Sequence, residues 1–123
     1  MEVNKFLSIL NRKKQIEISK LEIEKNIDNL RYIKDNIRLE VIKGYSAIQL
    51  NSKILLHREE ALSVCKMQLS YVDIEYNNNS IEIADFSRVH DSYVKAIVAY
   101  EESRNNYLNS IMILEELTGV NFR

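Results

Sequence analysis

The stretch Tyr76-Asn77-Asn78-Asn79-Ser80 separates two helical patterns. After it, large apolar residues recur every seven positions: Phe86, Tyr93, Tyr100, Tyr107 and Leu114. Before it, a line with the same spacing contains Val41, Ile48, Leu55, Leu62, Leu69 and Tyr76. A seven-residue repeat keeps one stripe of a helix turned toward a neighbouring helix. The two lines therefore predict an all-α fold, a long antiparallel two-helix coiled-coil hairpin, with the second line as its packing seam.

We expect a single helical hairpin over residues 1–123, with a helix at about 3–76, a turn at 77–82, a second helix at about 83–117 and a short tail. The chain has no proline and 2 glycines, so the usual helix breakers are almost absent. Asparagine tolerates the left-handed conformation that ends helices, which lets Asn77 to Asn79 replace a glycine. Ser80 or Glu82 is expected to open the second helix, with Asp85 in its first turn, where acids are favoured.

One alternative for the turn region remains open. Polar and apolar residues alternate in 71–76 and again in 80–83, as they do in a β-hairpin. The helical prediction is favoured because the seven-residue lines reach both flanks of the turn.

Apolar residues also occur off the main lines, at Ile18, Leu39, Ile42, Leu50, Ile54 and Leu56. A lone hairpin would leave several of them in water, so the excess predicts more than one helical neighbour and self-association.

Composition excludes several classes of protein. With 46% hydrophobic and 28% charged residues the chain is neither disordered nor a membrane bundle, and its net charge of −1 argues against nucleic-acid binding. No segment approaches the ~20 apolar residues of a membrane-spanning helix, so no direct membrane insertion is expected. The first residues do not resemble a signal peptide, which predicts a cytoplasmic location if the chain is a complete gene product.

The sequence predicts no catalytic residues, no metal site and no cofactor. His57 and Glu60 lie one turn apart, but two ligands do not make a metal site. Cys65 has no neighbouring base and is expected to pack as a small hydrophobic residue. His90 is expected to be packed and hydrogen-bonded on a line with Ile83 and Ile97. The spaced tyrosines admit a base-stacking role, although their regular spacing favours packing.

The ordered motifs resemble the second long α-helical hairpin of TolC-family outer membrane efflux proteins. In that family a tyrosine and a glycine precede a Ser/Thr-rich turn and an acid that opens the last long helix. Tyr76, Ser80 and Asp85 match this pattern, and the Asn106-Tyr107-Leu108 and Leu117-Thr118-Gly119 stretches resemble its later motifs. The resemblance covers residues from about Leu30 to Gly119. Asn79 stands where the family usually has glycine.

The resemblance implies a non-enzymatic transport module on the periplasmic side of the outer membrane. It implies a trimeric α-barrel, a gate and an adaptor protein docked on the hairpin tip, whose residues here are Tyr76, Asn79, Ser80, Glu82, Asp85 and Arg88. Ile81 and Arg88 replace an arginine and an aspartate of the best-known gate. The alternative function is a free-standing coiled-coil assembly or scaffold protein that self-associates.

Overall fold

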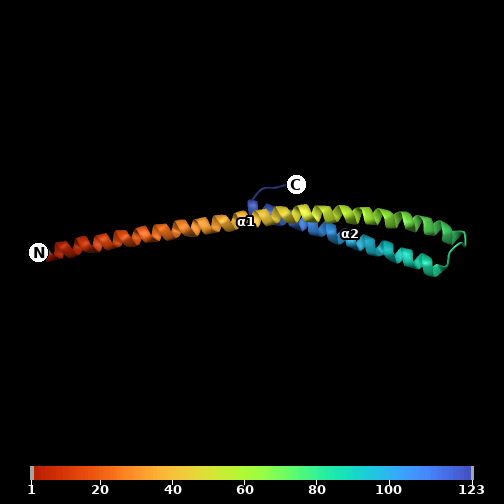
Figure 1. The fold of residues 1–123 in the computed structure, drawn as a ribbon, viewed down its shortest axis with the longest axis horizontal. Helices are drawn as coiled ribbons and strands as arrows, with labels where there is room; N and C mark the ends of the chain where they lie inside the picture. Colours follow the sequence, from red (N-terminus) through yellow and green to blue (C-terminus); the bar gives the residue numbers. More distant parts are fainter. Residues whose placement is uncertain (1, 123) are drawn as a thin grey trace. The chain divides into compact units, whose positions relative to one another are not determined.

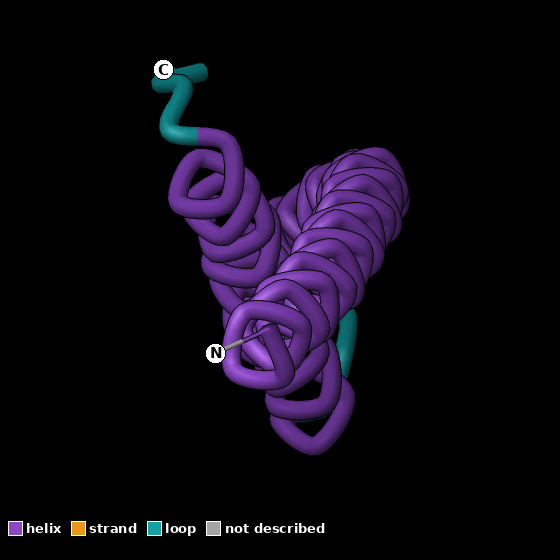
Figure 2. The backbone as a smooth tube through the Cα atoms, turned by 90° about the vertical axis from the view of Figure 1, so that its left-hand side faces the viewer, coloured by secondary structure: helices purple, strands orange, loops and turns teal. Residues whose placement is uncertain are grey.

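The computed structural model describes residues 2–122, which form two helices. Helix α1 spans Glu2–Asn77 and α2 spans Ile83–Thr118. Figure 2 shows these helices with loops at the turn and at the tail, and no residue from 2 to 122 belongs to a strand. The predicted all-α hairpin is therefore confirmed. The β-hairpin alternative is wrong, because residues 71–76 belong to α1.

The chain divides into two compact units, Met1–Glu40 and Val41–Arg123. In the first unit, every described residue belongs to α1 and is exposed. The second unit is the hairpin, in which the remainder of α1 and the whole of α2 run in opposite directions (Figure 1, yellow to green and teal to blue).

The two helices of the hairpin meet along a seam of alternating three- and four-residue steps, interrupted once in α1, where Arg58 is exposed. In α1 the half-buried positions at this spacing are Val41, Gly44, Ile48, Asn51, Leu55, Leu62, Cys65, Leu69 and Val72. In α2 the half-buried or buried ones are Phe86, Val89, Tyr93, Ala96, Tyr100, Ser103, Tyr107, Ser110 and Leu114. Such alternation is the contact pattern of a coiled coil. These residues are called the seam below.

Three small residues, Ala96, Ser103 and Ser110, lie in the seam on α2. Ser103 and Ser110 are buried, and their hydroxyls donate to the backbone oxygens of Ala99 at 2.8 Å and Tyr107 at 2.7 Å. Bonding within the same helix leaves these hydroxyls without any need for a partner on α1. On α1, Gly44 lies opposite Leu114, whose Cδ1 would be 3.1 Å from a Cβ atom added at Gly44. The helices are therefore close together at this end of the hairpin.

Asn79 ends α1 in the left-handed conformation, with φ of 56°. The Ser80 N–H donates to the Glu75 carbonyl at 2.8 Å, and the Asn79 N–H donates to the Tyr76 carbonyl at 3.0 Å. These two bonds form a Schellman motif with asparagine in the usual glycine position. Glu82 then caps α2 with an extended backbone, and its carbonyl accepts the N–H groups of Asp85 and Phe86.

Because its φ is positive, Asn79 provides a direct test of the turn. Asn79→Gly should preserve or slightly raise the free energy of unfolding, whereas Asn79→Val should lower it by about 1–2 kcal/mol, the cost of a branched residue in the left-handed region. Urea unfolding followed by circular dichroism measures both. Asn78→Val is the control, since φ at Asn78 is not positive. Equal losses for the two valine variants would contradict the assignment.

Candidate interaction surfaces

At the tip of the hairpin, one of the predicted tip residues, Tyr76, contacts Phe86 of the seam. Tyr76 and Phe86, from different helices, stack with ring centroids 5.0 Å apart and planes tilted by 31°. The His90 ring lies 6.4 Å from that of Phe86. His90 is exposed, so its predicted packed position is wrong. The reason is that Val89, three residues after Phe86, occupies the next seam position.

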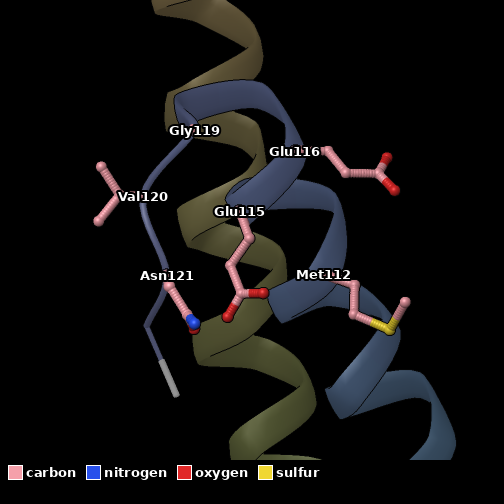
Figure 3. Close-up of a pocket in the computed structure, with 6 residues that line it drawn as sticks. All are labelled: Met112, Glu115, Glu116, Gly119, Val120 and Asn121. Carbon is pink, nitrogen blue, oxygen red and sulfur yellow. The ribbon is translucent and has the colours of Figure 1, made fainter.

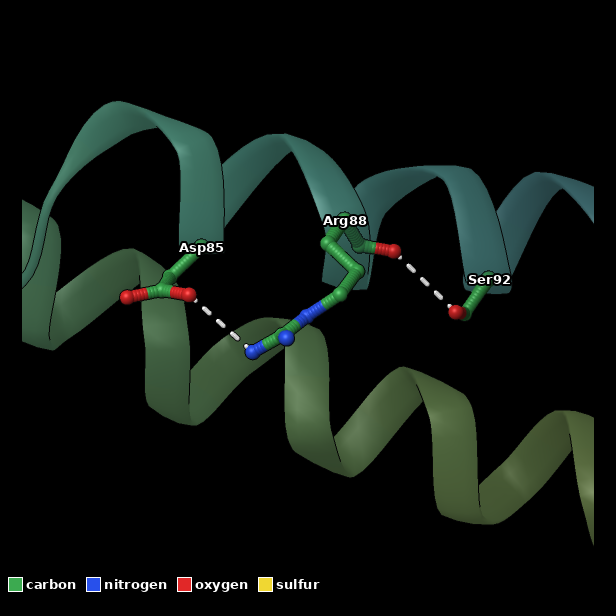
Figure 4. Close-up of polar contacts among 3 residues, drawn as sticks. All are labelled: Asp85, Arg88 and Ser92. Atoms are coloured by element: carbon green, nitrogen blue, oxygen red, sulfur yellow. Dashed lines mark hydrogen bonds and ion pairs between the residues drawn. The ribbon is translucent and has the colours of Figure 1, made fainter.

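Asp85 and Arg88 form an ion pair on the first turns of α2 (Figure 4). Arg88 Nη2 lies 3.0 Å from Asp85 Oδ1, and the Arg88 carbonyl accepts a hydrogen bond from Ser92 Oγ at 3.0 Å. Both ionic side chains are exposed, so the pair contributes no more than about 0.5 kcal/mol. The Asp85 carboxylate thus has a cation within its own helix. Ser80 and Glu82 are exposed beside it, and a gating role for these residues stays a prediction.

A second apolar stripe follows the surface of α1 outside the seam. It consists of Leu50, Ile54, Ala61, Val64 and Tyr71, and is called the outer stripe below. Its steps of three, four or seven residues place these side chains on one face of the helix. Leu50 is 60% exposed, Val64 52% and Tyr71 66%. The hairpin alone leaves this face uncovered.

One residue of the outer stripe, Tyr71, has a pKa that differs from its ordinary value. The side chain of Tyr71 is hydrogen-bonded to the Glu75 carboxylate one turn later. This bond, together with the negative charge of Glu75, raises the pKa of Tyr71 above its ordinary value of 10.0.

The tail after α2 forms a shallow hollow of about 340 Å³ (Figure 3). Gly119 adopts φ of 69°, and its N–H donates to the Glu115 carbonyl at 2.8 Å. The chain then turns back, and the Phe122 N–H donates to Glu115 Oε1 at 3.1 Å. Because the tail itself uses the Glu115 carboxylate, we attribute the hollow to the packing of the tail.

Groups able to carry other chemistry are dispersed. His57 Nδ1 and Glu60 Oε2 are 3.9 Å apart, and Cys65 is half-buried in the seam. Within residues 2–122, no three His, Cys, Asp or Glu side chains are grouped closely enough to hold a metal ion. Over the same residues, no helix has both the length and the apolar character needed to cross a membrane.

Sequence reasoning missed half of the seam on α2. The aromatic line Phe86, Tyr93, Tyr100, Tyr107 and Leu114 lies along it, but so does the line Val89, Ala96, Ser103 and Ser110. The available signal was a seven-residue repeat of small residues. A second omission is Asn51, whose Nδ2 donates across the seam to the Asn106 carbonyl at 3.4 Å. A polar residue inside a coiled-coil seam favours one register of the two helices.

No family model, curated protein or solved structure matches the chain. The chain is an antiparallel two-helix hairpin.

Proposed function

We propose that this chain is a non-enzymatic assembly module whose hairpin packs, through the outer stripe of α1, against helices of further copies. The observation that carries the proposal is the outer stripe itself. Its residues have the spacing of a helix contact, yet Leu50, Val64 and Tyr71 are more than half exposed.

Energetics support a partner for this face. Burying a side chain such as leucine or valine is worth about 1.5–3 kcal/mol relative to leaving it in water. A helix with one apolar stripe needs one neighbour, and a helix with two stripes can pack against two. In α1 the seam is covered by α2, which leaves the outer stripe for a second neighbour.

Association should therefore depend on the outer stripe. The parent chain of 14.5 kDa should form dimers or larger species at tens of micromolar. The double variant Leu50→Lys/Val64→Lys should have a clearly lower average mass at the same concentration, because two buried ammonium groups oppose the contact. Light scattering after size-exclusion chromatography measures the mass.

The matched control is Gln49→Lys/Ser63→Lys, which adds the same charge one residue away from the stripe. It should keep the mass of the parent chain. The proposal is wrong if the parent chain remains monomeric at high micromolar concentration, or if the two double variants have the same mass.

A second candidate is the wall of a TolC-like α-barrel with a tip that docks a periplasmic adaptor. It is favoured by the two stripes on α1, since each helix in a barrel wall contacts neighbours on two sides, and by the exposed acids Glu82 and Asp85 at the tip. The ion pair between Asp85 and Arg88 weakens the case for a cation-attracting ring of aspartates. The resemblance implies a closed trimer, so a mass other than that of three chains would count against this second candidate.

A further inference from the structure

The first unit carries an apolar line that no residue of that unit covers. Within residues 2–40, Ile9, Ile16, Ile23, Leu30 and Ile37 repeat every seven positions. All five are exposed, from 49% at Ile37 to 65% at Leu30. A parallel line three positions earlier contains Phe6, Lys13, Lys20, Ile27 and Lys34. Together the two lines have the spacing of a coiled-coil contact with three lysines in it.

We propose that residues 17–40 pair with the same segment of a second copy, antiparallel, with Ile27 of one copy opposite Leu30 of the other. This inference rests on the proposed function in that both require self-association, but it names a different surface. It also commits to one orientation of the two helices.

The lysines in the contact lines decide against a parallel pair. In a parallel, in-register pair each residue of these lines faces its own copy, so Lys13, Lys20 and Lys34 would form three like-charged layers. In the antiparallel pair, Lys20 lies opposite Ile37 and Lys34 opposite Ile23. The aliphatic part of each lysine then covers an isoleucine while its ammonium group reaches water.

The flanking charges favour the same arrangement. Within residues 17–40, the positions directly after the residues of the main line hold Glu17, Glu24, Arg31 and Arg38 in turn. Antiparallel helices bring these flanking positions together in reverse order, so Glu17 meets Arg38 and Glu24 meets Arg31, each twice. A parallel pair would bring together only Arg12 and Glu17, also twice. Charges at flanking positions are the features that set orientation in coiled coils.

Charge reversal tests the pairing in the full-length chain. We use the Leu50→Lys/Val64→Lys background, in which the outer stripe is disabled, and expect dimers that are smaller than the assembly of the parent chain. Glu24→Arg in that background should weaken dimerisation about tenfold or more, since two attractive pairs become repulsive. Adding Arg31→Glu should restore it. Sedimentation equilibrium measures the dissociation constants, and circular dichroism checks that each variant keeps its helix content.

Orientation is read from a single spin label. Lys14→Cys is labelled in a chain that also carries Cys65→Ala. In the antiparallel pair the two labels lie about 29 residues apart along the axis, or roughly 44 Å. In a parallel pair they lie on neighbouring helices, under about 25 Å apart including the label arms. Pulsed electron paramagnetic resonance measures the distance.

These results distinguish a failure of the antiparallel pair from a failure of the proposed function. Rescue by the charge swap together with the long distance supports the antiparallel pair. The antiparallel pair is wrong, and the proposed function stands, in any of three cases. The background variant is monomeric while the parent chain associates, Glu24→Arg has no effect on dimerisation, or the distance between the spin labels is short. A monomeric parent chain overturns both.

Discussion

Leu114→Ala should lower the free energy of unfolding by about 2.5–4 kcal/mol, within the range found for buried leucines. Leu114 is 5% exposed, and it is the large side chain placed against Gly44. Truncation removes apolar contacts and leaves a cavity beside Gly44. The second helix has 36 residues and depends on the seam for its stability, so the loss should be a large share of the total.

The control is the adjacent residue. Ile113 is 55% exposed, and Ile113→Ala should cost less than about 1 kcal/mol. Both variants are unfolded in urea at the same chain concentration, because association stabilises the folded state by mass action. Comparable losses at the two positions would show that Leu114 does not lie in the seam.

Gly44→Leu should be the second most damaging change, with a loss of about 2–3 kcal/mol. Leucine is a good helix former, so the substitution improves the local helix propensity of α1 by a fraction of about 1 kcal/mol relative to glycine. Any net loss must come from the contact with α2. The Cβ atom would lie 3.1 Å from Leu114 Cδ1 and 3.8 Å from Leu114 Cβ, so Leu114 has to shift to admit the new side chain.

Two further variants make this prediction specific. Ser46→Leu, at an exposed position of the same helix, should be neutral or slightly stabilising. In a Leu114→Ala background, Gly44→Leu should cost at least about 1 kcal/mol less than in the parent chain, because the cavity receives the new side chain. Thermal and urea unfolding measure the coupling. Strict additivity would mean that the two side chains are not in contact.

Substitutions in the seam and substitutions in the two proposed association surfaces should change different properties of the chain. Substitutions in the seam act on stability, because that contact lies within the hairpin. Substitutions in the outer stripe and in residues 17–40 act on association and should leave the helix content nearly unchanged. This division makes the mass measurements interpretable, since a variant can lose assembly without losing its fold.

Two features of the hairpin were predictable from the sequence. Seven-residue lines on both sides of Asn77-Asn78-Asn79 indicated two helices and one reversal, because the period of a contact stripe depends only on helix geometry. The role of asparagine as the left-handed residue was also predictable, and Asn79 has φ of 56°. Asparagine pays a smaller steric penalty in that region than other non-glycine residues.

The choice of residues within the seam was less predictable. Val89 and His90 lie three and four residues after Phe86, and both spacings suit a helix face. The same ambiguity separates Ala96 from Ile97 and Ser103 from Arg104. Hydrophobicity favoured Ile97, and the line through it placed His90 inside. The structure instead puts His90 outside and buries Ser103.

The sequence by itself determined that two helices form, where the chain reverses and that more apolar surface exists than one hairpin can bury. Those properties follow from local geometry and from residue spacing. Only the tertiary structure decided which side of α2 faces α1, because this depends on how closely two particular helices can approach. Gly44 on one helix and Ser103 and Ser110 on the other allow a close approach, and Leu114 fills the space that Gly44 leaves.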